Sequence, residues 1–260
     1  MTAFFQGVKQ TQITAGGFTG PLPIFYYDST AMVAAFTAST AKVAPLVPDP
    51  DLHPVELRPG RCLVNVAALE HRRTDIGPYA EVIVSAMVAF GRRPLPLLHA
   101  AGQLLRHALH GYVLHLPVTT EPARAGGVEV YGYPKFIADV TFTRSQDRFT
   151  CSVSDAGRRI LTLDGEYLKL YGTGRSHVKL YSMKDGRLLC APVEMNSRQH
   201  AQTLRRHAAR LDLGSEHGMA RDLAALELEP HAVVYQLDPV LEIILYAPHP
   251  AREPLGRVGT

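Results

Sequence analysis

Short β-prone apolar runs, separated by turn signals, dominate the second half of this chain. The runs lie at 112–118, 140–143, 149–153, 160–163, 167–171, 178–182 and 188–193. The last two flank Lys184-Asp185-Gly186, and an Asp-Gly pair in that position strongly indicates a β-hairpin. Many strands at such short spacing predict a sheet that closes, or nearly closes, into a barrel.

Longer apolar runs mark the first half and the end of the chain. The runs at 61–69 and 80–90 are separated by a polar turn at 71–77, and they predict a hairpin with much of its surface buried. A last strand is expected at 237–246, beside the C-terminus. We therefore expect an antiparallel β-barrel-like core.

Helical patterns are fewer. Asp28-Ser29-Thr30 is typical of an N-cap, and the Ala-rich segment 31–36 after it predicts a helix. Apolar residues at helical spacing predict another helix at 97–109, and helical character returns at 198–211 and 215–226. These expectations define the fold class as α+β, with a few helices outside the barrel.

No repeat, charge run or low-complexity linker divides the 260 residues. We expect a single domain over residues 1–250 and a disordered tail at 251–260, where the sequence is polar and contains proline. The first residues lack a basic start followed by an apolar core, and the longest apolar stretch, 82–90, is too short to cross a bilayer. A cytoplasmic protein without a membrane partner is the expectation.

Composition argues against several classes of partner. The formal net charge is only +3, and the arginine pairs are scattered rather than gathered on one stripe, so nucleic-acid binding is not expected. The three cysteines, Cys62, Cys151 and Cys190, form no CxxC pair, which argues against a disulfide framework or a cysteine zinc site. The histidines between 99 and 115 lack an HExxH run and a completing carboxylate, so no metal is expected.

Lys135 is the strongest candidate for chemistry. It follows Tyr131-Gly132-Tyr133-Pro134 and precedes Phe136, so its neighbours are bulky or stiff. If this segment is buried, desolvation disfavours the ammonium and lowers the pKa of Lys135. A neutral amine can attack a ketone and form an imine. The alternative from composition alone is a surface lysine whose stem packs on Tyr133.

A family resemblance favours the chemical interpretation. The run 127–135 is similar to the active-site segment of the acetoacetate decarboxylase superfamily, whose lysine after a Tyr-Pro or Phe-Pro pair forms a Schiff base. The segment 116–124 resembles the stretch that leads into that lysine, and 238–242 resembles the C-terminal strand. Pro78-Tyr79-Ala80-Glu81 resembles the Tyr-x-Glu element, whose glutamate lies in the pocket. The resemblance extends roughly over residues 20–246.

Three departures from that family are visible. Phe136 stands where the decarboxylase has a second lysine, so only a hydrophobic pocket is left to activate Lys135. Tyr27 aligns with an arginine that helps to hold the substrate, and Asn65 with a further pocket glutamate. The resemblance thus implies imine chemistry. The second lysine, the arginine and the further glutamate, which suit the family's site to acetoacetate, are missing here.

Glu81 is the candidate proton shuttle for this chemistry. A carboxylate beside a carbinolamine can move protons while the imine forms and hydrolyses. Glu81 opens the apolar run 82–84, and burial there is expected to raise its pKa. The alternative interpretation is that Glu81 is a strand residue that faces solvent. Glu121, in the turn-rich segment 121–127, either orients the site or pairs with Arg124.

Three functions stay open at this point. The first is a Schiff-base lyase that decarboxylates a small β-keto acid, with Lys135 and Glu81 as catalytic residues and no cofactor. Its pocket residues are expected to be Tyr27, Tyr79, Glu121, Tyr131, Tyr133 and Phe136. The second is an aldolase or dehydratase that uses the same imine as an enamine. The third is a barrel that binds a small apolar ligand without turnover.

A homo-oligomer is the last expectation. The predicted helix at 97–109 is apolar over a broad face, with leucines and alanines on more than one side. If the strands already fill the barrel core, part of this face is left uncovered. An uncovered apolar patch on a soluble protein often marks an interface. Closed symmetric homo-oligomers are the commonest assemblies of this kind.

Overall fold

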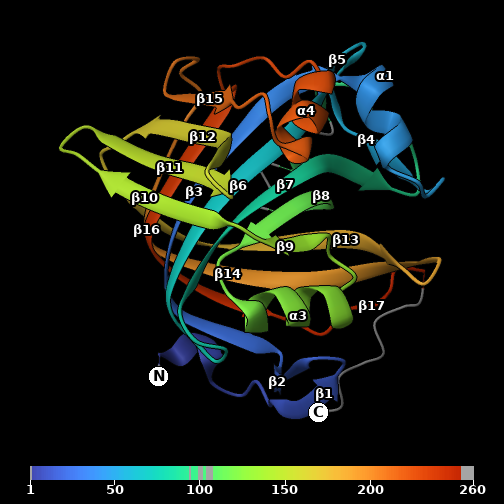
Figure 1. The fold of residues 1–260 in the computed structure, drawn as a ribbon, viewed down its shortest axis with the longest axis vertical. Helices are drawn as coiled ribbons and strands as arrows, with labels where there is room; N and C mark the ends of the chain where they lie inside the picture. Colours follow the sequence, from blue (N-terminus) through green and yellow to red (C-terminus); the bar gives the residue numbers. More distant parts are fainter. Residues whose placement is uncertain (1, 94, 99–101, 104–107, 253–260) are drawn as a thin grey trace.

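Strands form most of the protein, and one large sheet closes on itself. The computed structural model describes residues 2–93, 95–98, 102–103 and 108–252. In its described part, seven strands pair in the order β7-β6-β3-β16-β14-β13-β8, and β8 pairs with β7 again (Figure 1). Their bounds are β3 Ile24–Ser39, β6 Arg61–Thr74, β7 Tyr79–Phe90, β8 Ala108–Val118, β13 Gly172–Lys184, β14 Arg187–Thr203 and β16 Val234–Leu245. The predicted barrel core is confirmed, and its pairings are antiparallel as expected except for the parallel pairing of β13 with β8.

Strand β3 replaces a predicted helix. The segment 31–36, which was expected to be helical because it is Ala-rich and follows a good N-cap, lies within β3 between β16 and β6. Small side chains let this strand bury both faces, and residues 29–32 and 34–36 are all buried. Helix propensity is a weak preference, and the hydrogen bonds to two neighbouring strands override it.

A second sheet lies beside the barrel (Figure 1). It contains β10 Asp139–Arg144, β11 Arg148–Asp155, β12 Arg158–Glu166 and β15 Ala209–Leu213. The three strands predicted at 140–143, 149–153 and 160–163 are therefore confirmed. The strand predicted at 167–171 is wrong, because that segment makes no ladder.

The C-terminal part of β14 and strand β15 replace a second predicted helix, at 198–211. Residues 199–203 pair with β16 and residues 209–213 pair with β12, so the two ends of this segment belong to two sheets rather than to one helix. In contrast, the predicted hairpin around Asp185-Gly186 is confirmed between β13 and β14. Both turn residues have positive φ, 50° and 72°, as a tight two-residue turn requires.

Short helices cover the barrel outside. Helix α3 Glu121–Glu129 occupies the segment that was expected to be a turn; Pro122 sits in its first turn, where proline is tolerated. Helix α4 Gly218–Ala225 confirms the helix predicted at 215–226. Helix α1 Thr40–Val43 follows β3. Most of the helix predicted at 97–109 lies outside the described residues, and Ala108 and Leu109 belong to β8.

The remaining elements are short. They are η1 Ala3–Phe5, β1 Thr11–Ala15, β2 Phe18–Leu22, η2 Ala44–Leu46, β4 Leu52–Pro54, β5 Glu56–Arg58, β9 Lys135–Ile137 and β17 His249–Pro250. Strand β17 pairs with β14, and Arg252 binds Asp49, so the chain is held to the body up to this point. The rest of the predicted tail, 253–260, lies outside the described residues. No helix in the described part is long and apolar enough to cross a membrane.

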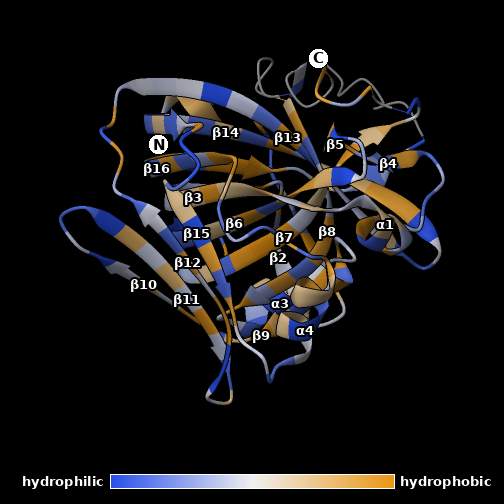
Figure 2. Cartoon of the chain, turned by 90° about the horizontal axis from the view of Figure 1, so that it is seen from above, coloured by the Kyte–Doolittle hydropathy of each residue, from blue (hydrophilic) through white to orange (hydrophobic). Residues whose placement is uncertain are grey.

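The barrel encloses a cavity of about 230 Å³. Strand residues alternate between the two faces of a sheet, and one set of alternate residues points into this space. Its wall is mostly apolar and contains Ala31, Val33, Ala67, Leu69, Ile83, Val193, Met195 and Ile243. The barrel strands alternate between hydrophobic and hydrophilic residues in Figure 2. Most of the lining surface is therefore apolar, and the polar residues set into it, among them Glu81, His71 and His200, mark the places where chemistry is possible.

Candidate active site

A tight turn after helix α3 sets the direction of Lys135. The Tyr133 amide donates to the Gly127 carbonyl at 2.9 Å, and the Lys135 amide donates to the Tyr133 carbonyl at 2.8 Å. Gly132 has a φ of 64°, in the left-handed region that glycine adopts more readily than residues with a side chain. The chain then enters β9, where Lys135 is the first residue and lies opposite Leu116 of β8. The turn and the parallel pairing together fix the lysine backbone.

The lysine stem passes directly over the backbone of Gly127 in α3. A Cβ atom at Gly127 would lie 2.2 Å from Lys135 Cδ and 2.6 Å from Cε. Such distances do not occur between real side chains, so any larger residue at position 127 forces the lysine to move. Gly127 is thus a glycine because the stem of Lys135 needs the space.

Lys135 meets Glu81 of β7 at the end of this path. Strand β7 pairs with β8, and Glu81 lies opposite Val118, two residues from the partner of Lys135. Lys135 Nζ donates to Glu81 Oε2 at 2.9 Å, and the two side chains are only 7% and 8% exposed. Glu81 lines the cavity, and Lys135 lies directly behind the lining, bonded to Glu81. A buried pair of this kind is costly to desolvate and persists only where the geometry is good.

The pKa of Glu81 differs from the sequence-based expectation. Burial raises this pKa, as predicted, and is the largest single effect. The charge of Lys135 and the hydrogen bond and charge of His71 together outweigh burial, and they lower the pKa from 4.5 to about 2. The prediction of a raised pKa was therefore wrong, because it considered the apolar neighbours in sequence and not the charged partners on nearby strands, His71 on β6 and Lys135 on β9.

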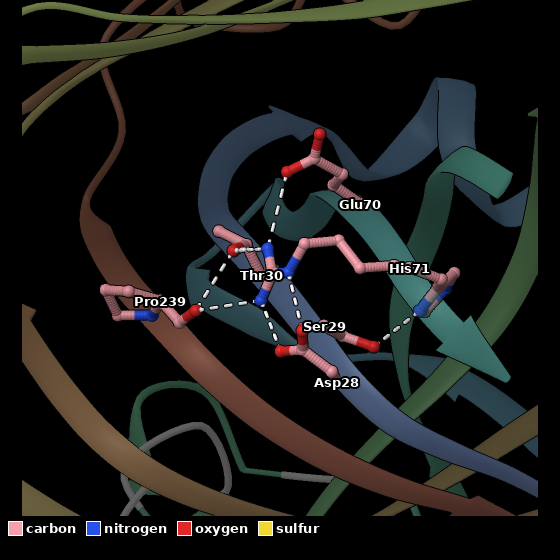
Figure 3. A network of polar contacts seen from close by, with 7 residues as sticks. Asp28, Ser29, Thr30, Glu70, His71 and Pro239 are labelled. Carbon is pink, nitrogen blue, oxygen red and sulfur yellow. Dashed lines mark hydrogen bonds and ion pairs between the residues drawn. The ribbon is translucent and has the colours of Figure 1, made fainter. Parts of the chain in front are cut away.

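His71 and Ser29 extend the pair into a chain of buried polar groups. His71 Nε2 lies 3.4 Å from Glu81 Oε1, and His71 Nδ1 lies 2.8 Å from Ser29 Oγ, the contact drawn in Figure 3. Both residues are almost fully buried. Neither residue was predicted from the sequence as part of the site. A signal existed: His71 lies directly opposite Tyr79 in the hairpin that carries Glu81, so a hairpin register would have found it.

A second polar network lies on the other face of the same strands and supports the strands that carry Ser29 and His71. Arg72 makes a two-bond contact with Asp28 and also donates to the Thr30 hydroxyl and the Pro239 carbonyl. Figure 3 shows Asp28, Thr30, Glu70 and Pro239 gathered there, with Ser29 and His71 to one side. Because neighbouring residues point to opposite faces, Arg72 ties β3, β6 and β16 together behind His71.

Four tyrosines surround the Lys135–Glu81 pair. The Tyr79 ring centroid lies 5.5 Å from Lys135 Nζ, and the Tyr26 and Tyr79 hydroxyls are 3.1 Å apart. Tyr131 and Tyr133 are stacked at 5.3 Å, and all four rings are buried. Burial, and next the negative charge of Glu81, raises the pKa of Tyr79 well above its ordinary value. These tyrosines are therefore neutral hydroxyl groups around the amine.

The structure does not bring three other predicted residues to this pair. Glu121 binds Arg124 on the surface with a side chain 62% exposed. Tyr27 points away from Tyr26, donates to Asp75 at 2.6 Å and packs with Phe5 and Phe25. Phe136 stacks on His217. Tyr27 directly follows Tyr26, and Phe136 directly follows Lys135. Successive side chains on a strand point to opposite faces, so Tyr27 and Phe136 point away from the site.

No cluster of three or more His, Cys, Asp or Glu that could hold a metal occurs within 2–93, 95–98, 102–103 and 108–252. Cys62, Cys151 and Cys190 are buried and unpaired with one another. Burial raises the pKa of the Cys62 thiol to about 11, so it is not a ready nucleophile. The amine of Lys135, bonded to the cavity-lining Glu81, is thus a better candidate nucleophile than these thiols.

Solved structures of other proteins share this fold. A structure of acetoacetate decarboxylase is 18% identical, with 90% of this chain and 91% of the other covered and a TM-score of 0.62. The acetoacetate decarboxylase of Legionella pneumophila subsp. pneumophila str. Philadelphia 1 is 14% identical, with 90% and 89% covered and a TM-score of 0.61. The enduracididine biosynthesis enzyme MppR, complexed with pyruvate, is 13% identical, with 90% and 92% covered and a TM-score of 0.61. At such identities the likeness shows the fold.

Sequence comparison assigns the family. No curated protein sequence matches the chain. The family model described as acetoacetate decarboxylase (ADC), however, matches residues 11–237, which is most of the chain and includes both Glu81 and Lys135. The chain therefore belongs to the acetoacetate decarboxylase family.

Proposed function

We propose that this protein is a Schiff-base-forming lyase whose Lys135 attacks the ketone of a small keto acid. The observation that carries the proposal is the buried contact of Lys135 Nζ with Glu81 Oε2, at 2.9 Å, on the wall of an apolar cavity. Members of this family include decarboxylases, and the pairing of an amine with one carboxylate is what imine chemistry needs.

The reaction begins when Lys135 gives up a proton and its Nζ attacks the carbonyl carbon. A C–N bond forms, and the carbonyl oxygen leaves as water after it has taken up protons, which gives an iminium ion. In a β-keto acid, the bond to the carboxylate then breaks and carbon dioxide leaves. The electron pair moves into the iminium, the resulting enamine is protonated at carbon, and water releases the ketone product and the free lysine.

Glu81 and His71 are suited to the proton transfers. Glu81 accepts the bond from Lys135 with one oxygen and faces His71 with the other. A proton taken from the amine can therefore stay on this carboxylate–imidazole pair until the carbinolamine oxygen needs it. Ser29 accepts from or donates to the far nitrogen of His71 and holds the ring in place. We propose Glu81 as the catalytic acid–base and His71 as its positioning residue.

An aldolase or dehydratase is the second candidate, and one feature of the cavity favours it. Among the described residues that line the cavity, Arg175 is the single lysine or arginine, and it lies on β13 rather than beside Glu81. A keto acid bound at Lys135 thus lacks the arginine that the decarboxylase uses. The structural neighbour MppR has been crystallised with the condensation product of pyruvate and imidazole 4-carboxaldehyde. An enamine on Lys135 that attacks an aldehyde fits the same geometry.

The two candidates differ in their products. Wild-type protein is incubated with a panel of β-keto acids, and with pyruvate plus aldehydes, while carbon dioxide and condensation products are measured. Carbon dioxide release from a β-keto acid supports decarboxylation, and condensation without carbon dioxide supports the aldolase. Either activity must vanish in Lys135→Ala and persist in Lys179→Ala, which removes an exposed lysine of β13. Binding of a small ligand without any product would instead indicate a non-catalytic barrel.

A further inference from the structure

One polar group of the cavity lining, His200, is held by a buried carboxylate and lies far from Lys135 in the sequence. His200 of β14 lines the cavity, and its Nδ1 lies 2.7 Å from Asp238 Oδ1 of β16. Asp238 is fully buried, and its other oxygen accepts a bond from Gln236 Nε2, which also lines the cavity. Burying a carboxylate is expensive unless its bonds are satisfied. Both oxygens of Asp238 are used to hold cavity-lining side chains, so this carboxylate fixes how those side chains are presented.

The strand register locates this group relative to Lys135. Glu81 lies opposite Leu69, Leu69 opposite Ala31, and Ala31 opposite Asp238. Glu81 and Asp238 are therefore the two ends of one row across β7, β6, β3 and β16. Neighbouring strands are about 4.8 Å apart, so the row is about 14 Å long on the curved wall. The straight path across the cavity between the two polar groups is shorter than that.

The wall between the two groups is apolar. Leu69 and Ala31 lie within the row, and Val33, Ala67 and Ile83 line the next inward-facing positions on the same strands. A substrate as short as pyruvate on Lys135 would leave this wall and His200 untouched. The cavity therefore fits a ketone with an apolar body that continues past the reacting carbonyl.

The hydrogen bond to Asp238 determines what His200 can recognise. A carboxylate accepts the Nδ1–H of the ring, so in the neutral imidazole Nε2 is left as an acceptor. Nε2 has no protein partner among the residues that the structure describes. A carboxylate on the ligand would be disfavoured by the negative charge of Asp238 close behind the ring. A hydroxyl donates to Nε2, and its oxygen can accept from the amide of Gln202 or Gln236, which line the same part.

We propose that His200, held by Asp238, binds a hydroxyl group at the far end of an elongated ketone whose carbonyl reacts with Lys135. This inference rests on the proposed Schiff-base function and narrows its substrate class to keto compounds, keto acids included, that have an apolar middle and a hydroxyl at the far end. His200 is a binding residue in this scheme, and Asp238 is a positioning residue that acts through it.

The test uses matched ketones and borohydride trapping. Methyl ketones of increasing chain length that end in a hydroxyl are each compared with the ketone in which a methyl replaces that hydroxyl. The trapped adduct on Lys135 is measured against ketone concentration. At the chain length that spans the cavity, wild type is expected to trap the hydroxyketone at about tenfold lower concentration, the value of one good hydrogen bond.

Substitutions then assign the preference to His200. His200→Leu is expected to lose the preference while it still traps the plain ketone normally, which shows that the fold and Lys135 are intact. His200→Gln and Asp238→Asn, which keep size and polarity, are expected to weaken the preference. His177→Leu removes an exposed histidine of β13 and should leave the preference unchanged. Equal trapping of both ketones at every length in wild type, or a preference that survives His200→Leu, overturns the proposal.

Failure of the imine chemistry is recognised separately. If no ketone of either kind is trapped, the Schiff-base function is refuted and the distal site is judged by binding alone. Calorimetry of Lys135→Ala with the same ketone pairs gives that measurement. Tighter binding of the hydroxyketone, lost in the double variant with His200→Leu, supports the distal site; equal binding overturns it.

Discussion

Gly127 controls the position of the proposed nucleophile although it carries no side chain. Replacement by alanine would normally favour a helix such as α3 by roughly 0.5–1 kcal/mol. Here the new Cβ would lie 2.2 Å from Lys135 Cδ, and the lysine stem must move away. We expect Gly127→Ala to fold and to lose at least about 100-fold in catalytic rate, because a shift of about 1 Å at a reacting group has such an effect.

The matched control is Gly218→Ala. Gly218 begins helix α4, and a Cβ atom there meets no atom within 4 Å. This variant should keep both stability and activity. Wild-type activity in Gly127→Ala would contradict the assignment of Lys135, since the lysine could not then occupy its observed place.

Glu81 gives the protein a defined response to acid. Its pKa in the folded state is about 2, against 4.5 when unperturbed, so the unfolded chain binds its proton more readily. Glu81 therefore stabilises the fold fully above pH 4.5, and this contribution is lost as the pH falls toward 2. We expect the free energy of unfolding of wild type to fall more steeply over that range than that of Glu81→Gln.

Denaturant titrations at several pH values measure this difference. Glu121→Gln serves as the control, because Glu121 is exposed and its ionic partner among the described residues is Arg124, at the surface. Parallel pH profiles for wild type and Glu81→Gln would show that the carboxylate is not held by Lys135 and His71.

At the scale of elements, the β13–β14 hairpin is the part that local sequence specified best. Asp185-Gly186 demands a tight turn, and the strands on both sides follow from it. We expect Gly186→Ala to lower the free energy of unfolding by about 1 kcal/mol, because a side chain is disfavoured at its φ of 72°. Denaturant titration measures this difference. A free energy of unfolding of Gly186→Ala equal to that of wild type would contradict this turn geometry.

The elements that were predicted wrongly share a physical cause. Segment 31–36 has the alanines of a helix, yet it lies in β3 because hydrogen bonds to β16 and β6 outweigh local propensity. Glu121–Glu129 has a proline and two glycines, yet it forms α3, where Pro122 fits the first turn and Gly127 makes room for Lys135. For β3 the deciding partners are distant in the sequence, and for α3 the deciding contact is with Lys135, just beyond the end of the helix.

The candidate site shows the same limit. The Lys135 motif and Glu81 were recognisable in the sequence, and the structure places them in contact. His71 and Ser29 carry no motif, and only the register of β3, β6 and β7 brings them to Glu81. Likewise, the pKa of Glu81 depends on His71 and Lys135, which lie on other strands. The apolar residues next to Glu81 in the sequence could not indicate these partners.

At the scale of the whole molecule, we predict a homo-oligomer. The helix at 97–109 that suggested one lies largely outside the described residues. Among those described nearby, however, Leu95, Leu97 and Leu98 are exposed, and such apolar surface favours an interface. Light scattering at micromolar concentration should give a multiple of the monomer mass, and Leu97→Glu combined with Leu98→Glu should reduce it. A monomer mass for wild type would refute the prediction.

The Schiff base on Lys135 is the central claim for the whole protein, and trapping tests it most directly. Wild type is incubated with pyruvate, acetoacetate and longer keto compounds, reduced with borohydride, digested and mapped by mass spectrometry. We predict an adduct on the peptide that contains Lys135, absent in Lys135→Ala and unchanged in Lys179→Ala. Lack of an adduct with every keto compound, or an adduct on another lysine, would contradict the claim.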